Sequence, residues 1–238
     1  MCSSDLALLA SPLSDRVAVT GDLFRPDRVR STMALERPLP PKRAGVARVT
    51  FLGQLVERKG LHVLIEALSR TKSACELLLA GGNWDAPGYP QRLKSLVADA
   101  GLSSRIHFQN HRQDVGAVLS DADIFVLPSL SEARPRSIIE AMSLGVPVVA
   151  SDVGGIPSLV AHDETGLLVP PGNAEGLALA IDRLVQSQDL RSRLAAAARA
   201  YAERECRADR TAGEYVGLYR RLVAERPGAP SRVLGAGA

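Results

Sequence analysis

From residue 46 onward, the sequence alternates between short apolar runs and segments with helical periodicity. The apolar runs are nearly continuous, which is typical of strands that are buried on both faces. Such strands, separated by helices, predict a doubly wound α/β fold with helices on both faces of a parallel sheet. The expected strands are 46–52, 76–80, 105–109, 124–127, 146–150 and 167–169. The expected helical segments are 61–68, 92–100, 115–120, 138–144 and 157–161, followed by C-terminal helices at 174–187, 189–206 and 208–225.

Residues 1–45 do not continue this pattern. The apolar run at 16–20 has no neighbouring run to pair with, and a lone strand cannot bury two faces. Residues 25–45 are rich in proline and arginine, which suits a linker between domains. Since 238 residues suit one large domain and little more, we predict three parts. These are a remnant of an N-terminal domain with its linker (1–45), the main domain (46–226) and a disordered tail (227–238), in a chain that begins inside a larger protein.

Composition excludes several classes of protein. The net charge of +3 is too small to indicate a nucleic-acid groove, and 4% aromatic residues leave little for base stacking. The sequence lacks an apolar run long enough to span a membrane. Three widely spaced cysteines form neither a disulfide framework nor a zinc-binding pattern. We therefore expect a cytoplasmic protein that binds no nucleic acid.

In an open parallel sheet, ligands bind at the carboxyl ends of the strands, so the loops that follow strands decide the function. The loop after the first strand reads GQLVERKG, from Gly53 to Gly60. Gly53 permits a close approach of backbone, while Arg58 and Lys59 come just before a helix N-terminus, which favours an anion. The alternative is a solvated basic loop. Neither a G-x-G-x-x-G nor a Walker A motif is present, so ordinary dinucleotide and P-loop sites are not predicted.

The loop after the strand at 124–127 carries two carboxylates around a helix start. Pro135 suits the first turn of a helix, which places Glu132 before that helix and Glu140 within its early turns. The free N–H groups of the helix N-terminus can hold phosphate oxygens, and a carboxylate inside the helix can accept hydrogen bonds from a vicinal diol such as a ribose. For either glutamate alone, a capping or surface role is the stronger interpretation.

Taken together, these segments resemble the C-terminal, donor-binding domain of retaining GT-B glycosyltransferases, the group 1 class of glycosyltransferase family 4. The family signatures correspond to the loop 53–60, to an E-x7-E from Glu132 to Glu140, and to the run GVPVVASDVGGIP at 145–157. They continue with DETGLLVPPGN at 163–173, and the resemblance covers residues 15 to 225. It implies that the α/β fold is the Rossmann-like half of a GT-B fold and that 46–226 binds a nucleotide-sugar donor.

The resemblance also implies roles for individual residues. Lys59 would contact the donor diphosphate and Glu132 the transferred sugar, as the catalytic pair, while Glu140 would bind the ribose. The diphosphate site would be completed by Gly53, Gln54, Arg58, Arg136 and Ser137, and Asn110 and His111 would border the base. Gln54 stands where the family often has arginine, and Arg58 is placed to compensate. No cofactor or metal is implied, because the family usually stabilises the leaving diphosphate without one.

Several alternatives stay open. Asp121 and Asp123 form a D-x-D like the Mn²⁺-binding motif of the other major glycosyltransferase fold, but their place before a buried strand favours a structural role. The chain could instead be a non-catalytic nucleotide-sugar-binding subunit or a nucleotide-sugar epimerase of the same fold. In the glycosyltransferase interpretation, the acceptor is a saccharide, a lipid or a small molecule, and the acceptor side belongs to a missing N-terminal GT-B domain. The arginine-rich C-terminal helices leave open a peripheral contact with the inner face of a membrane, although a solvated face is favoured.

Overall fold

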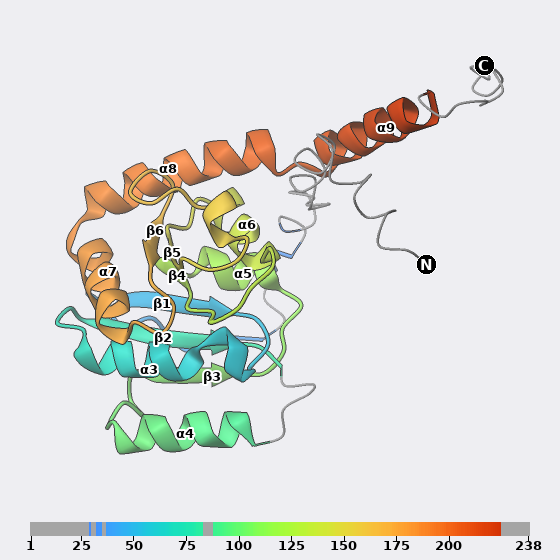
Figure 1. Cartoon of the computed structure of the whole chain (residues 1–238). Coiled ribbons are helices and arrows are strands. Elements are labelled where there is room, and N and C mark those ends of the chain that lie inside the picture. The colour runs from blue at the N-terminus through green and yellow to red at the C-terminus, as the bar shows by residue number, and fades with distance from the viewer. Residues whose placement is uncertain (1–28, 30–31, 35–36, 83–87, 225–238) are drawn as a thin grey trace.

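The computed structural model describes residues 29, 32–34, 37–82 and 88–224. The expected strand at 16–20 and the tail at 227–238 lie outside the described residues. Within them, the chain forms a six-stranded, entirely parallel sheet flanked by helices (Figure 1). The predicted α/β fold class is therefore confirmed.

The strands are β1 (Ala47–Leu52), β2 (Cys75–Ala80), β3 (Ile106–Gln109), β4 (Ile124–Leu127), β5 (Val148–Ser151) and β6 (Leu167–Val169). The helices between them are η1 (Glu57–Lys59), α3 (Leu61–Arg70), α4 (Tyr89–Asp99), α5 (Val115–Ser120), α6 (Arg136–Ser143) and η2 (Ile156–Ser158). The C-terminal helices are α7 (Ala174–Gln186), α8 (Gln188–Glu205) and α9 (Ala208–Ala224).

The strand order is β3-β2-β1-β4-β5-β6, the order of a doubly wound sheet. From β1 the chain winds outward through β2 to β3, and from β4 it winds the opposite way through β5 to β6. Right-handed crossovers in opposite directions place their helices on opposite faces of the sheet. Accordingly, α3 packs against α4 and α7, and α6 packs against α5 and α8. The winding reverses between β1 and β4, so the carboxyl ends of these two strands form the switch point of the sheet, where such folds bind ligands.

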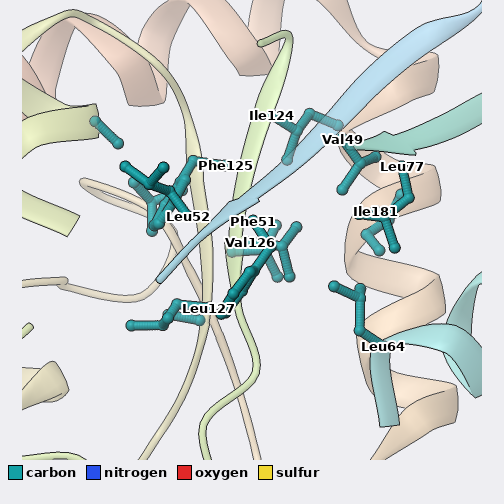
Figure 2. Close-up of a cluster of buried hydrophobic side chains, with 14 of the residues drawn as sticks. Val49, Phe51, Leu52, Leu64, Leu77, Ile124, Phe125, Val126, Leu127 and Ile181 are labelled. Carbon is teal, nitrogen blue, oxygen red and sulfur yellow. The ribbon is translucent and has the colours of Figure 1, made fainter. Parts of the chain in front are cut away.

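The core consists of the apolar strand residues and the helix faces that cover them. Val49 of β1 and Leu77 of β2 are fully buried, as are Leu64 of α3 and Ile181 of α7, and these side chains belong to one cluster (Figure 2). Because β1, β2, β4 and β5 are buried along almost their whole length, the sheet is a rigid base for the loops at its carboxyl edge. α9 extends away from the body of the domain (Figure 1).

The element boundaries differ from the sequence predictions mainly at prolines. The helix expected from residue 92 begins at Tyr89, because Pro90 is tolerated in the first turn, where no helical N–H bond is needed. The strand expected from residue 146 begins at Val148, because Pro147 has no N–H and contributes only its carbonyl, which accepts from the Phe125 N–H at 2.9 Å. Pro135, expected within the first turn of its helix, lies one residue before the start of α6.

Candidate functional site

A cleft of about 410 Å³ lies at the switch point, between the loops that follow β1 and β4. Most of the predicted site residues line it: Gly53, Gln54, Lys59, His111, Glu132, Arg136, Ser137 and Glu140. They come from the β1 loop, the β3 loop and the β4 loop with the start of α6. The structure thus brings Lys59 and the helix that carries Glu140 to one crevice, although the two residues are far apart in the sequence.

The β1 and β4 loops are fastened to each other beside this cleft. Gly60 has a left-handed φ of 66°, and a Cβ at this position would lie 2.0 Å from the carbonyl oxygen of Pro128, so no other residue fits without a shift of backbone. The Leu130 N–H donates to the Arg58 carbonyl at 2.7 Å. Between the two loops, the Lys59 ammonium donates to the Glu132 carboxylate, and both side chains are almost completely buried. The predicted catalytic pair is therefore in direct contact.

The loop that carries Glu132 also rests on a pair of glycines after β5. Gly154 has φ of 57°, and a Cβ there would lie 1.7 Å from the Glu132 carbonyl oxygen. A Cβ on Gly155 would lie 1.9 Å from the Ala133 carbonyl oxygen, and the Gly155 N–H donates to the Glu132 carbonyl at 3.3 Å. These glycines belong to the run 145–157 noted in the sequence, and their contacts explain why two consecutive glycines are needed there.

The N-terminus of α6 opens into the cleft. Pro135, Arg136 and Ser137 all line it, and among the described side chains none caps this helix end. The first N–H groups of the helix and the Arg136 guanidinium therefore favour an anion at this wall. Burial raises the pKa of Glu140 above its ordinary value, and the nearby Arg136 guanidinium only partly opposes the shift.

Arg58 and Asn110 do not line the cleft, although both were predicted to belong to the site. Arg58 is exposed, and its guanidinium donates to the side-chain oxygen of Gln54 at 3.0 Å, so it contacts a cleft residue from outside. Asn110 lines an adjoining cavity of about 280 Å³ that shares Gly81, Gly82 and His111 with the cleft.

The sequence analysis missed several residues that line the cleft, including Gly81, Gly82, Arg112 and Arg134. Gly81 and Gly82 end the β2 run, and their position at a strand end was an available signal. A Cβ on Gly81 would lie 1.7 Å from the Gly53 carbonyl oxygen, so the β1 and β2 loops meet backbone to backbone. The two arginines follow no spacing that would have singled them out.

Asp121 and Asp123 lie before β4, at the end of the sheet opposite the cleft. Asp121 accepts from the buried Arg48 guanidinium, and Asp123 accepts from the Arg48 N–H at 2.6 Å and pairs with Lys42 at 2.8 Å. Both carboxylates are thus engaged in structural contacts. Across the described ranges, no cluster of three or more histidine, cysteine or acidic residues has metal-binding geometry.

The fold and the cleft together define a Rossmann-like α/β domain with a cleft at the switch point of its parallel sheet, the place where such folds bind ligands. A sequence profile of the family described as glycosyl transferases group 1 matches residues 36–201, well over half of the chain. The chain belongs to this family, and the resemblance seen in the sequence motifs is confirmed.

Named relatives agree with this assignment. The lipopolysaccharide core biosynthesis glycosyltransferase LpsE of Rhizobium meliloti (strain 1021) is 34% identical over 176 residues, which cover 74% of this chain and 48% of LpsE. The amylovoran biosynthesis glycosyltransferase AmsK of Erwinia amylovora is 32% identical over 206 residues, 81% of this chain and 47% of AmsK. Anabaena Alr3699/HepE, crystallised with UDP and glucose, superposes with a TM-score of 0.72 at 27% identity over 75% of this chain and 49% of HepE. The chain spans about half the length of the curated relatives it matches.

None of the helices in the described part of the chain combines the length and the apolar character needed to cross a bilayer.

Proposed function

We propose that this chain supplies the donor-binding half of a glycosyltransferase, which moves a sugar from a nucleoside-diphosphate sugar to an acceptor with retention of configuration. The observation that carries the proposal is that Lys59, the start of α6 and Glu140 line one cleft at the switch point of the sheet. The crystal structure of HepE with UDP and glucose supports a donor of this class, because that protein has the same fold.

In this proposal the donor diphosphate lies between Lys59 and the N-terminus of α6. Lys59, Arg136 and the helix N–H groups would stabilise the negative charge that develops on the leaving nucleoside diphosphate, and fixed donors of this kind need no reorganisation during the reaction. Glu140 would accept from the ribose hydroxyls, and Glu132 from the transferred sugar. The base would lie toward His111 and the cavity that contains Asn110. No metal is assigned, because Lys59, once it exchanges Glu132 for the diphosphate, and the N-terminus of α6 would supply the positive charge.

The proposal assigns the acceptor side to a second, N-terminal GT-B domain. The acceptor would attack from the face that the diphosphate leaves, so this chain would provide no nucleophile. The class of acceptor, whether saccharide, lipid or small molecule, depends on that second domain. A nucleotide-sugar-binding role is therefore the part of the proposal that the 238-residue chain can be tested for by itself.

The test is calorimetric titration of the chain with UDP, GDP and ADP and with their glucose conjugates. We expect one nucleotide series to bind more tightly than millimolar, with the same affinity in EDTA and in Mg²⁺. Loss of a charge-assisted hydrogen bond costs about 1.5–3 kcal/mol, so Lys59→Ala should weaken binding roughly tenfold or more. Lys72→Ala is the matched control, because Lys72 is an exposed lysine in the turn before β2, at the other end of the sheet. Absence of binding to every nucleotide, or equal affinities for the wild type and Lys59→Ala, would refute the donor-site assignment.

A further inference from the structure

The described residues that precede β1 contact the rest of the domain. We call residues 29, 32–34 and 37–43 of this segment the strap. At the amino end of the sheet, the buried Arg48 guanidinium donates to the Pro40 carbonyl at 2.8 Å, Lys42 pairs with Asp123, and Arg43 donates to Glu76 at 3.3 Å. These contacts lie away from the cleft and hold the C-terminal part of the strap in place.

The other end of the strap caps helix α5. The Thr32 hydroxyl oxygen accepts from the Gly116 N–H at 2.8 Å, and the Thr32 carbonyl accepts from the Ala117 N–H at 2.9 Å. A Cβ on Gly116 would lie 2.2 Å from the Val29 carbonyl oxygen, so the strap can approach this helix end only because residue 116 is glycine. Because α5 starts directly after the loop 110–114, the strap supports one end of the loop that carries His111 to the cleft.

A reciprocal pair of hydrogen bonds joins the middle of the strap to the same loop. The exposed Arg37 guanidinium donates to the His111 carbonyl at 3.0 Å, and the Arg112 guanidinium donates back to the Arg37 carbonyl at 2.7 Å. The Arg112 side chain is completely buried, and its guanidinium also donates two hydrogen bonds to the Asp114 carboxylate, one of them from Nε to Oδ1 at 2.9 Å. A buried guanidinium must have its N–H groups satisfied, so the position of Arg37 and the position of the Arg112 side chain depend on each other.

His111 and Arg112, the two residues that form hydrogen bonds with Arg37 of the strap, both line the cleft. We propose that Arg37 and Arg112 are positioning residues, which set the His111 wall of the cleft and thereby couple the placement of the strap to the binding of the nucleoside diphosphate. The inference rests on the proposed function, since it concerns the affinity of the same site. Neither arginine is assigned a contact with the reacting atoms. They act by fixing the loop, as supporting hydrogen bonds fix the geometry of binding sites elsewhere.

The experiment compares two arginine deletions within the strap. Arg37→Ala removes the donor to His111, while Arg43→Ala removes an exposed arginine of the same strap whose partner, Glu76, lies outside the cleft. Each variant of the 238-residue chain is titrated with UDP, GDP and ADP, and amide hydrogen exchange is followed across residues 109–114 without ligand. We expect Arg37→Ala to weaken the preferred nucleotide roughly three- to tenfold and to speed exchange in that loop, and Arg43→Ala to do neither.

The outcomes distinguish a failure of this inference from a failure of the proposed function. If the wild type binds a nucleotide and Arg37→Ala binds it equally well, the coupling is refuted and the donor site stands. Equal weakening by Arg37→Ala and Arg43→Ala would mean a general loosening of the strap, which also refutes it. If the wild type binds no nucleotide, the proposed function fails and the inference fails with it. Arg112→Lys is a second variant, which keeps the charge but loses the fork that reaches both Asp114 and Arg37. The Arg112→Lys variant should lower nucleotide affinity at least as much as Arg37→Ala does.

Discussion

Replacing Gly154 with alanine tests whether the glycine pair after β5 places the Glu132 loop. Two costs add at this position. Holding a non-glycine residue at a φ of 57° costs about 1 kcal/mol. The new Cβ, 1.7 Å from the Glu132 carbonyl oxygen, must also displace backbone, and overpacking of this kind costs about 2–3 kcal/mol. The sum of about 3–4 kcal/mol corresponds to a fall in Tm of roughly 6–16 °C for a chain of this size.

Gly101→Ala is the matched control. Gly101 also has a left-handed φ, of 66°, but a Cβ there meets nothing within 4 Å, so only the cost of about 1 kcal/mol and roughly 2–4 °C applies. The entropy that alanine removes from the unfolded chain is the same in both variants and cancels in the comparison. Urea and thermal unfolding followed by circular dichroism measure both. Equal losses of stability in Gly154→Ala and Gly101→Ala would refute the claim that backbone contact with Glu132 requires glycine at residue 154.

Two further predictions concern ionisable groups. Burial raises the pKa of Glu140, so the ionised carboxylate destabilises the folded protein. As pH rises above the ordinary value of about 4.3 and through the raised pKa, the wild type should lose stability that the Glu140→Gln variant keeps. Urea unfolding at about pH 4 and about pH 8 measures the difference in free energy of unfolding between the two proteins. If that difference does not change with pH, the raised pKa of Glu140 is contradicted. Burial by itself would raise the pKa of Asp182, but N–H donors from Lys72 and Ser73, at 2.9 Å, outweigh burial and hold the pKa below its ordinary value. The Asp182 carboxylate therefore stabilises the fold above about pH 4, and this stabilisation is lost as pH falls further. The Asp182→Asn variant should be less stable than the wild type by about 1–2 kcal/mol at neutral pH. On acidification, it should lose less of its free energy of unfolding than the wild type does.

The fold could be predicted because its signal is local. The buried strands are continuous apolar runs, and the expected strand at 124–127 and the expected helix at 115–120 coincide with β4 and α5. The strand order could not be obtained in this way, since no local pattern specifies which strands are neighbours. That Lys59, Glu132 and Glu140 line one cleft could be predicted, because they lie in the loops that follow β1 and β4 or in the first turns of the helix after β4, where a ligand site is expected.

The residues that the sequence did not reveal depend on contacts between distant segments. Arg112 is one of many arginines in the sequence, and only its burial against Asp114 and Arg37 distinguishes it. Gly154 lies in the run 145–157 noted in the sequence, but the reason for a glycine there appears only in the structure, because the loop that it contacts lies more than twenty residues earlier in the chain. The segment 25–45 had the composition of a linker, but its described residues accept hydrogen bonds from the side chains of Arg112, which follows β3, and of Arg48, which lies within β1. A composition rich in proline and arginine indicates that a segment forms neither a strand nor a helix. It does not indicate which parts of the domain the segment contacts.

The contact between Lys59 and Glu132 is more readily explained by a ligand than by stability. A buried ion pair can often be replaced by apolar residues without loss of stability, because desolvation offsets most of the attraction between the charges. This pair lies at the edge of the cleft, between the two loops of the switch point. Under the proposed function, a diphosphate that enters beside Lys59 would compete with Glu132 for the ammonium group. A carboxylate released from Lys59 in this way could accept hydrogen bonds from the hydroxyls of the sugar. Under the proposed function, the roles assigned to Lys59 and Glu132 are therefore coupled: donor binding would exchange the contact between them for contacts with the diphosphate and with the sugar.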